Sequence, residues 1–192
     1  MANIIKYRGI SPIIEQSTFI ANNATIIGDV RIGENSSIWY NCVLRGDVTK
    51  ISIGSNSNIQ DNCIIHGTRP NHAQNKTGAE GAPVKIGNCV TIGHSAIIHA
   101  CTINDYAFVG MGSIVMDLAV IESNGMLGAG GVLTPKKIIK SGEIWAGNPA
   151  KFLRMMTQIE IDYIKIPSDK KTEMKKIKAG VKKIFTEFFL KK

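Results

Sequence analysis

The chain has 192 residues, of which 44 % are hydrophobic and 20 % are charged, and its formal net charge is +8. This length and composition suit one folded domain, or one domain with an appendage, and exclude a disordered polymer. The positive charge is concentrated in residues 165–192, which carry a net +7 and leave +1 for residues 1–164. Residues 165–192 contain no arginine, so we expect a solvated lysine face and no nucleic-acid partner.

No apolar run approaches the roughly 20 residues of a membrane-spanning helix, and Met1–Gln16 has no secretory apolar stretch. We therefore expect a cytoplasmic protein without a membrane span. The four cysteines form no CxxC pair. They are expected to be small buried thiols, because a reducing compartment does not sustain a disulfide framework.

Aliphatic residues recur at intervals of six along most of the chain, a period that neither an α-helix nor a β-strand generates. They form four series: Ile20, Ile26, Ile32, Ile38 and Leu44; Ile53, Ile59 and Ile65; Ile86, Ile92 and Ile98; and Ile103, Val109, Val115, Ile121, Leu127 and Leu133. Turn-forming pairs such as Asp61-Asn62 lie between them. Each hexad therefore predicts a short strand and a corner. Three hexads complete one coil of an all-β triangular prism, a parallel β-helix, over residues 1–150.

Residues 151–192 are expected to form a helical segment that packs on this prism. A first helix is predicted over Phe152–Ile166 and ends at Pro167. A second helix is predicted from apolar residues spaced by three and four: Met174, Ile177, Val181, Ile184, Phe185, Phe188 and Phe189. We expect this stripe to cover a face of the prism, and a helix that binds a partner or a membrane surface is the alternative.

Three of the four histidines have positions that predict a metal site. His66 and His99 each directly follow a core isoleucine and share one outward phase, one coil apart if residues 68–85 loop out of the prism. Adjacent coils lie about 4.8 Å apart, so the two imidazoles can converge on one metal. His94 falls on a different face, from which it can complete the site only in a neighbouring subunit of a trimer. We expect His72, in the loop, to lie in solvent.

Other polar residues share this region of the prism. Arg45 has the outward phase of His66, Asp47 lies at the adjacent corner, and Gln60 and Asp61 open the hexad before His66. Arginine and aspartate form strong ion pairs. Arg45, Asp47 and Asp61 therefore either build an ion-pair network between subunits or belong to the site, and both remain open. Gln60 is expected to face the metal.

The chain resembles the gamma-class carbonic anhydrase family in six segments: Leu44-Arg45-Gly46-Asp47, Asn58-Ile59-Gln60-Asp61-Asn62, His66, Gly93-His94 through His99, Val109-Gly110-Met111-Gly112 and Ala146-Gly147-Asn148-Pro149-Ala150-Lys151. The match runs from about Ile10 to Arg154. It implies a left-handed β-helix of the hexapeptide-repeat superfamily, assembled as a homotrimer, that converts carbon dioxide to bicarbonate reversibly.

The same resemblance implies roles for single residues. His66 and His99 of one subunit and His94 of the next bind zinc, or iron or cobalt. Arg45 and Asp47 pair across subunits, Gln60 hydrogen-bonds the water on the metal, and Asn58 and Asp61 accompany it in the matching segment, so these five make up the catalytic set.

The sequence departs from the family pattern at two positions and in one segment, Thr68–Val84, which is longer than in many bacterial relatives. Val48 follows Asp47 where the family prototype has a glutamate, and Lys171 stands where relatives place a tyrosine, with Tyr163 as the nearest substitute. Two other functions stay open: a metal-binding trimer without turnover that serves assembly, and a hexapeptide-repeat acyltransferase with an outward histidine as general base. The acyltransferase needs no metal triad.

Overall fold

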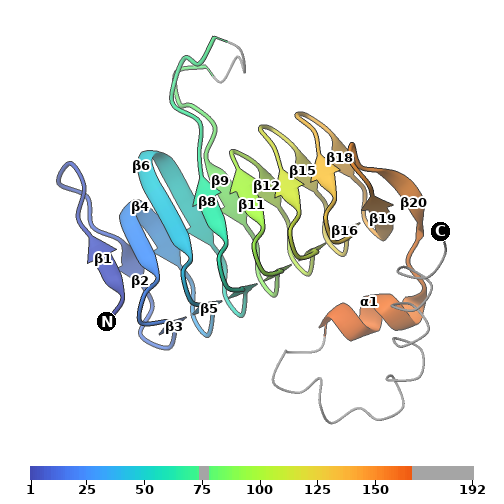
Figure 1. Ribbon diagram of the computed structural model, residues 1–192, viewed down its shortest axis with the longest axis horizontal. Helices are drawn as coiled ribbons and strands as arrows, with labels where there is room; N and C mark the ends of the chain where they lie inside the picture. Colours follow the sequence, from blue (N-terminus) through green and yellow to red (C-terminus); the bar gives the residue numbers. More distant parts are fainter. Residues whose placement is uncertain (74–77, 166–192) are drawn as a thin grey trace.

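The computed structural model describes residues 1–73 and 78–165. Its strands stack coil upon coil along one axis, and together they form the predicted triangular prism (Figure 1). Coils pair through parallel strands on three faces. The expected β-helix of hexapeptide repeats is therefore confirmed.

Each face of the prism takes one strand, or one part of a long strand, from successive coils. The first face contains β1 (Asn3–Ile5), the first parts of β4 (Thr25–Ile32) and β6 (Val43–Ile53), β8 (Ile64–His66), β11 (Ile97–His99), β14 (Ile114–Val115) and β17 (Val132–Leu133). The second face contains β2 (Ile13–Ile14), the last parts of β4 and β6, β9 (Val84–Ile86), β12 (Thr102–Ile103), β15 (Val120–Ile121) and β18 (Ile138–Ile139). The third face contains β3 (Phe19–Ile20), β5 (Ser37–Ile38), β7 (Asn58–Ile59), β10 (Thr91–Ile92), β13 (Phe108–Val109), β16 (Met126–Leu127), β19 (Glu143–Ala146) and β20 (Lys151–Met155).

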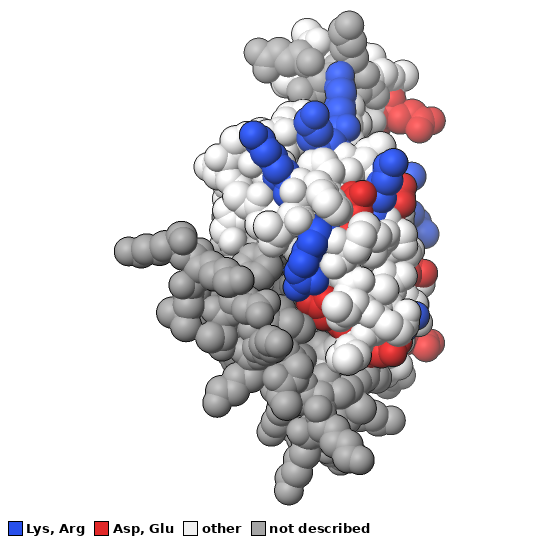
Figure 2. Space-filling model, turned by 90° about the vertical axis from the view of Figure 1, so that its right-hand side faces the viewer, with Lys and Arg blue, Asp and Glu red and all other residues white. Residues whose placement is uncertain are grey.

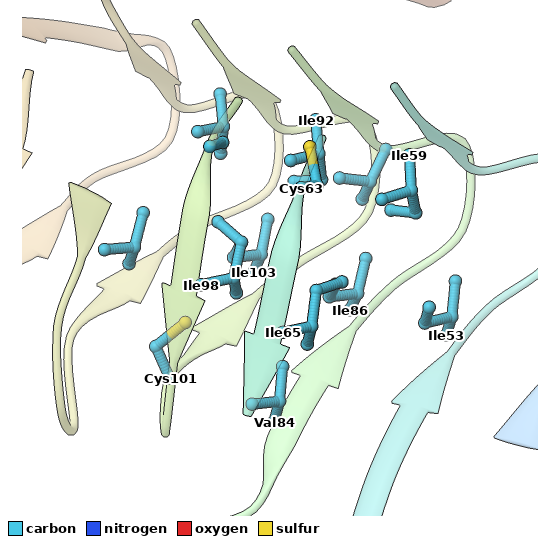
Figure 3. Close-up of a cluster of buried hydrophobic side chains, with 14 of the residues drawn as sticks. Ile53, Ile59, Cys63, Ile65, Val84, Ile86, Ile92, Ile98, Cys101 and Ile103 are labelled. Atoms are coloured by element: carbon cyan, nitrogen blue, oxygen red, sulfur yellow. The ribbon is translucent and has the colours of Figure 1, made fainter. Parts of the chain in front are cut away.

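The phased aliphatic residues fill the interior of the prism. Figure 3 shows several of them in the middle coils, where isoleucines from neighbouring strands lie against one another beside Cys63 and Cys101. Ile65, Ile98 and Ile103 have no exposed surface. Burial of such side chains stabilises the fold by roughly 1.5–3 kcal/mol each. The thiols of Cys42, Cys63 and Cys101 are free and buried as predicted, while Cys89 is only partly buried.

The corners use residues that tolerate a positive φ. Asn41, Asn62 and Ser95 have φ values of 59°, 63° and 60° at successive coils between the third and first faces. Asparagine adopts this left-handed conformation more readily than most residues. The predicted corner pair Asp61-Asn62 thus turns the chain at the expected place.

One long excursion leaves the prism between β8 and β9 and projects from the coils (Figure 1). Its base is closed by Thr68 and Ala82, which pair in antiparallel orientation. Because this segment loops out, β8 and β9 keep their places on the first and second faces. This is the arrangement that the prediction for residues 68–85 required.

The first C-terminal helix is shorter than predicted. Residues Lys151–Met155 form β20, which pairs antiparallel with β19, and α1 spans Gln158–Lys165. The predicted helix was therefore wrong over Phe152–Met155. These residues form a strand because the free edge of β19 offers backbone hydrogen bonds to them. Thr157 and Glu160 then start the helix with reciprocal hydrogen bonds between side chain and backbone.

The predicted second helix, over Met174–Phe189, lies outside the described residues. No helix in the described part of the chain is long and apolar enough to cross a membrane. Figure 2 shows Lys and Arg side chains spread over the C-terminal end of the prism with Asp and Glu side chains among them. The described surface at this end therefore carries charges of both signs.

Candidate metal centre

His66 and His99 lie on adjacent coils at the edge of the first face. His66 is in register with His99 on one side and with Arg45 on the other. The predicted stacking of these three residues is confirmed. It follows from the hexad phase, since parallel pairing in register places equivalent outward residues of neighbouring coils side by side.

The imidazole of His66 is oriented by Asp47. Its Nε2 atom lies 3.0 Å from Oδ1 of Asp47, and Nη1 of Arg45 donates to Oδ2 of the same carboxylate at 2.5 Å. Burial by itself raises the pKa of Asp47, but the hydrogen bonds from His66 and Arg45 outweigh it and hold this pKa below its usual range. Asp47 is therefore an ionised acceptor, and Nε2 of His66 carries the proton.

The imidazole of His99 is oriented in the same way by Asp117. Nδ1 of His99 lies 2.7 Å from Oδ1 of Asp117, and the hydroxyl of Thr68 donates to Oδ2. Burial acts to raise the pKa of Asp117, yet the hydrogen bonds from Thr68 and His99 lower it on balance. Nδ1 of His99 therefore carries the proton.

Sequence reasoning missed Asp117 and Thr68. A signal for Asp117 was present, because Met116 has the phase of His99 one coil later and Asp117 follows it directly. Thr68 gave no such signal, since it lies on the excursion outside the repeat.

These tautomers leave two lone pairs that face each other. Nδ1 of His66 lies 3.3 Å from Nε2 of His99, and neither atom has a proton to donate to the other. Two nitrogen ligands at about 2.0–2.1 Å from a tetrahedral zinc lie about 3.3 Å apart. The donor pair therefore fits a tetrahedral metal ion. Burial lowers the pKa of His66, which favours the neutral imidazole that a metal requires.

His94 lies at a different corner of the prism, between the third and first faces. Its Nδ1 atom lies 2.9 Å from Oδ2 of Asp61 on the preceding coil, and half of its side-chain surface is exposed. Within the described residues of one chain, no group of three His, Cys, Asp or Glu side chains is placed to hold a metal. A single chain thus presents His94 apart from the His66 and His99 pair.

The other predicted residues divide between these corners. Gln60 ends the third face directly before Asp61, so it lies at the corner of His94. Asn58 lies in β7, where its Oδ1 atom accepts a hydrogen bond from Ser37. Arg45 pairs with Asp47 of its own chain, and the pairing across subunits that the resemblance implies stays a prediction.

The remaining expectations concern the surroundings of the site. His72 is partly buried rather than exposed, because the excursion folds back on itself. Val48 is exposed beside Asp47, and Tyr163 lies in α1 at the C-terminal end. Lys171 lies outside the described residues.

Comparisons with known proteins identify relatives of this chain. The bacterial transferase hexapeptide model matches residues 11–46. The chain is 42 % identical to a carbonic anhydrase of Geobacillus kaustophilus over 82 % of this chain and 81 % of that protein. It is 47 % identical to the mitochondrial gamma carbonic anhydrase 2 of Arabidopsis thaliana over 80 % of this chain. The chain belongs to the gamma-class carbonic anhydrase family.

The extent of the match differs among the members of this family. The chain spans only 54 % of the Arabidopsis protein, about half the length of that relative. Among solved structures, a hexapeptide transferase family protein from Anaplasma phagocytophilum is 50 % identical, with a TM-score of 0.77 over 94 % of this chain and 97 % of that one.

Proposed function

We propose that this gamma-class family member is a carbonic anhydrase that hydrates carbon dioxide to bicarbonate reversibly at a metal shared between subunits of a homotrimer. In this proposal His66 and His99 of one subunit and His94 of the next hold the metal. The observation that carries it is the 3.3 Å approach of two nitrogen lone pairs, each fixed by a carboxylate on the far side of its ring.

Zinc is the proposed metal, with iron or cobalt as alternatives. Three neutral imidazoles and an open fourth position are a donor set typical of catalytic zinc. When bound, such a metal supplies the Lewis acidity that ionises water near neutral pH. Asp47, Asp117 and Asp61 each hold one imidazole in the tautomer that turns its other nitrogen toward the metal.

The roles of the remaining residues follow from their places. Arg45 holds Asp47 and keeps it ionised. Gln60 lies at the corner of His94, from which its amide would hydrogen-bond the reacting oxygen in the assembled site. Asn58 has its carbonyl oxygen engaged by Ser37, so we assign it to the support of the Gln60 segment.

The first face supports the proposed homotrimer. Its outward positions include a row of apolar residues from five successive coils: Val43, Ile64, Ile97, Ile114 and Val132. Ile64 and Ile97 are 47 % and 40 % exposed, and a contiguous apolar row on a flat face is typical of a protein interface. This face lies between the corner of His66 and His99 and the corner of His94. Three copies packed on it around an axis would bring the two kinds of corner together.

A cytoplasmic location, as expected from the sequence, is part of this proposal. The mitochondrial location in the names of the Arabidopsis relatives belongs to those proteins.

The deciding experiment is a metal and activity assay. The protein is purified without oxygen, its metal is counted per subunit, and carbon dioxide hydration is measured with zinc and with ferrous iron. We expect about one metal per subunit, because three interfaces contribute one site each, and hydration that depends on the metal.

Two other results would each favour one of the alternative functions. A metal-loaded trimer that hydrates no carbon dioxide would indicate an assembly role. A metal-free trimer that transfers an acyl group from an acyl thioester would indicate an acyltransferase and overturn the proposal.

A further inference from the structure

The base of the excursion between β8 and β9 touches the metal centre at one point. Thr68 is 5 % exposed and Asp117 is 8 % exposed, and the hydroxyl of Thr68 donates to Oδ2 of Asp117. Asp117 uses its other oxygen to hold Nδ1 of His99 at 2.7 Å. A chain of two hydrogen bonds therefore leads from the excursion to a proposed metal ligand.

The same arrangement surrounds each of the three histidines. One carboxylate oxygen accepts from the imidazole, and the other accepts from a second donor. The second donors are Arg45 Nη1 for Asp47, the Tyr40 backbone N–H for Asp61, and the Thr68 hydroxyl for Asp117. A carboxylate held at both oxygens cannot turn about its own axis, so the imidazole bonded to it keeps one orientation.

Thr68 is itself held by tight packing. It exchanges two backbone hydrogen bonds with Ala82, at 3.0 and 2.9 Å. A Cβ atom added at Gly81 would lie 2.6 Å from the carbonyl oxygen of Thr68, and one added at Gly67 would collide with the hydroxyl of Thr49. Only glycine fits at these two positions, which shows how closely the base of the excursion is packed against the coil.

We propose that Thr68 is a positioning residue of the metal centre, which fixes the carboxylate of Asp117 and through it the ring of His99. This inference rests on the proposed function, since it concerns a proposed metal ligand. Without the hydroxyl, the buried carboxylate of Asp117 loses one of the donors that fix its orientation, and it directs the Nε2 atom of His99 at Nδ1 of His66 less firmly. The excursion thus acts on the metal site through its first residues.

The test compares two substitutions at Thr68 with a matched one nearby. Thr68→Val keeps the shape of the side chain and removes the donor, and Thr68→Ser keeps the donor. The control is Thr49→Val in β6, which removes a hydrogen bond of 3.3 Å from the Thr49 hydroxyl to Ala82 O at the base of the excursion and leaves the bond between Thr68 and Asp117 in place. The readout is the dissociation constant for zinc and for cobalt, measured on the full chain by competition with a chelator.

We expect Thr68→Val to weaken binding about tenfold, the lower end of the range for changes behind a metal ligand. Thr68→Ser and Thr49→Val should stay within about twofold of the unchanged protein. If Thr68→Val does not fold, Thr68→Ala removes the same donor without the added methyl contact and carries the same expectation.

A second readout needs no metal. The protein has four histidines, so the imidazole nitrogens of a ¹⁵N-histidine sample can be assigned by NMR. We expect the metal-free protein to show His99 protonated at Nδ1, and Thr68→Val to show a mixture of both tautomers. The control Thr49→Val should retain the single tautomer.

The outcomes separate this inference from the proposed function. Unchanged metal affinity and an unchanged His99 tautomer in Thr68→Val would overturn the positioning role while the metal site stands. Equal losses of metal affinity in Thr68→Val and Thr49→Val would show that the base of the excursion contributes only to stability. That result would also overturn the positioning role. A chain that binds none of zinc, iron and cobalt before any substitution would overturn both.

Discussion

Asp61 holds His94 across one coil of the prism, with 2.9 Å between Oδ2 and Nδ1. The other oxygen of Asp61 accepts the backbone N–H of Tyr40 at 3.2 Å. The ring of His94 is thus fixed by its own chain, although half of its side chain is exposed. An exposed imidazole fixed in this way is ready to meet a group that its own chain does not provide.

Replacing Asp61 by Asn should weaken metal binding about tenfold, because the amide no longer favours the proton on Nδ1 of His94. Metal titration of the full chain measures this. The matched control is Asp105→Asn at a different corner, where Oδ1 accepts the backbone N–H of Asn88, and it should bind metal normally. Equal affinity in both variants would show that Asp61 does not serve the site.

Mixed trimers test the sharing of ligands between subunits. His94→Ala and His99→Ala should each abolish tight metal binding alone. In every mixed trimer one interface pairs an intact His66 and His99 with an intact His94, so an equal random mixture should recover about a quarter of the full metal content. The control mixture of His66→Ala with His99→Ala should recover none, because both ligands come from the same side. No recovery in the first mixture would contradict a shared site.

A charge on the outward row of the first face should disrupt the trimer. Ile97→Glu places a carboxylate where the proposal requires an apolar contact, so we expect subunits to separate, as measured by light scattering after size-exclusion chromatography. The buried neighbour Ile98 is unchanged. The fold and its circular dichroism spectrum should therefore be retained. Thr102→Glu, on the second face, is the control and should stay assembled. Dissociation by both variants, or by neither, would argue against an interface on the first face.

The contact between β20 and α1 should depend on pH. Arg154 donates to both carboxylate oxygens of Glu160 at 2.9 and 2.7 Å, and its guanidinium lowers the pKa of that carboxyl below the usual 4.5. A carboxyl with a lowered pKa in the folded state stabilises the protein above its usual value and loses this contribution as the pH falls through the folded value.

Glu160→Gln should therefore cost about 1–2 kcal/mol at neutral pH, discounted because the arginine is partly exposed. The difference in the thermal midpoint from the unchanged protein should shrink as the pH falls below about 4. Asp162→Asn, whose carboxylate accepts only an exposed hydrogen bond from Gln158 among its described contacts, is the control. A difference that stays constant with pH would contradict the ion-pair account.

Removal of the residues after Pro167 should lower thermal stability and promote aggregation. The apolar stripe predicted over Met174–Phe189 lies outside the described residues. Exposure of an apolar surface of this size to water is unfavourable, so we expect it to be buried against other residues. The exposed Phe152, Leu153 and Met155 of β20 would then lose a neighbour if the stripe packs there. Metal binding should persist, since none of the three histidines lies in that segment. A truncated protein as stable and soluble as the full chain would instead indicate that the segment docks on a partner.

The sequence by itself determined the repeat and, through the repeat, the places of the three histidines. Inward positions of a β-helix must be apolar on every coil. The sequence therefore shows apolar residues at intervals of six wherever the core continues. The phase of Ile65 and Ile98 then puts His66 beside His99 and leaves His94 at another corner. Parallel strands in register allow no other placement once the excursion is set aside.

Only the tertiary structure decided that Thr68 joins the surroundings of His99 and how the prism ends. Thr68 and Asp117 are 49 positions apart, and their contact depends on the path of an excursion that follows no period. The strand Lys151–Met155 formed because β19 exposes an unpaired edge, a property of the finished sheet and not of the local residues. Periodic burial is encoded residue by residue, whereas these contacts depend on where separate segments meet.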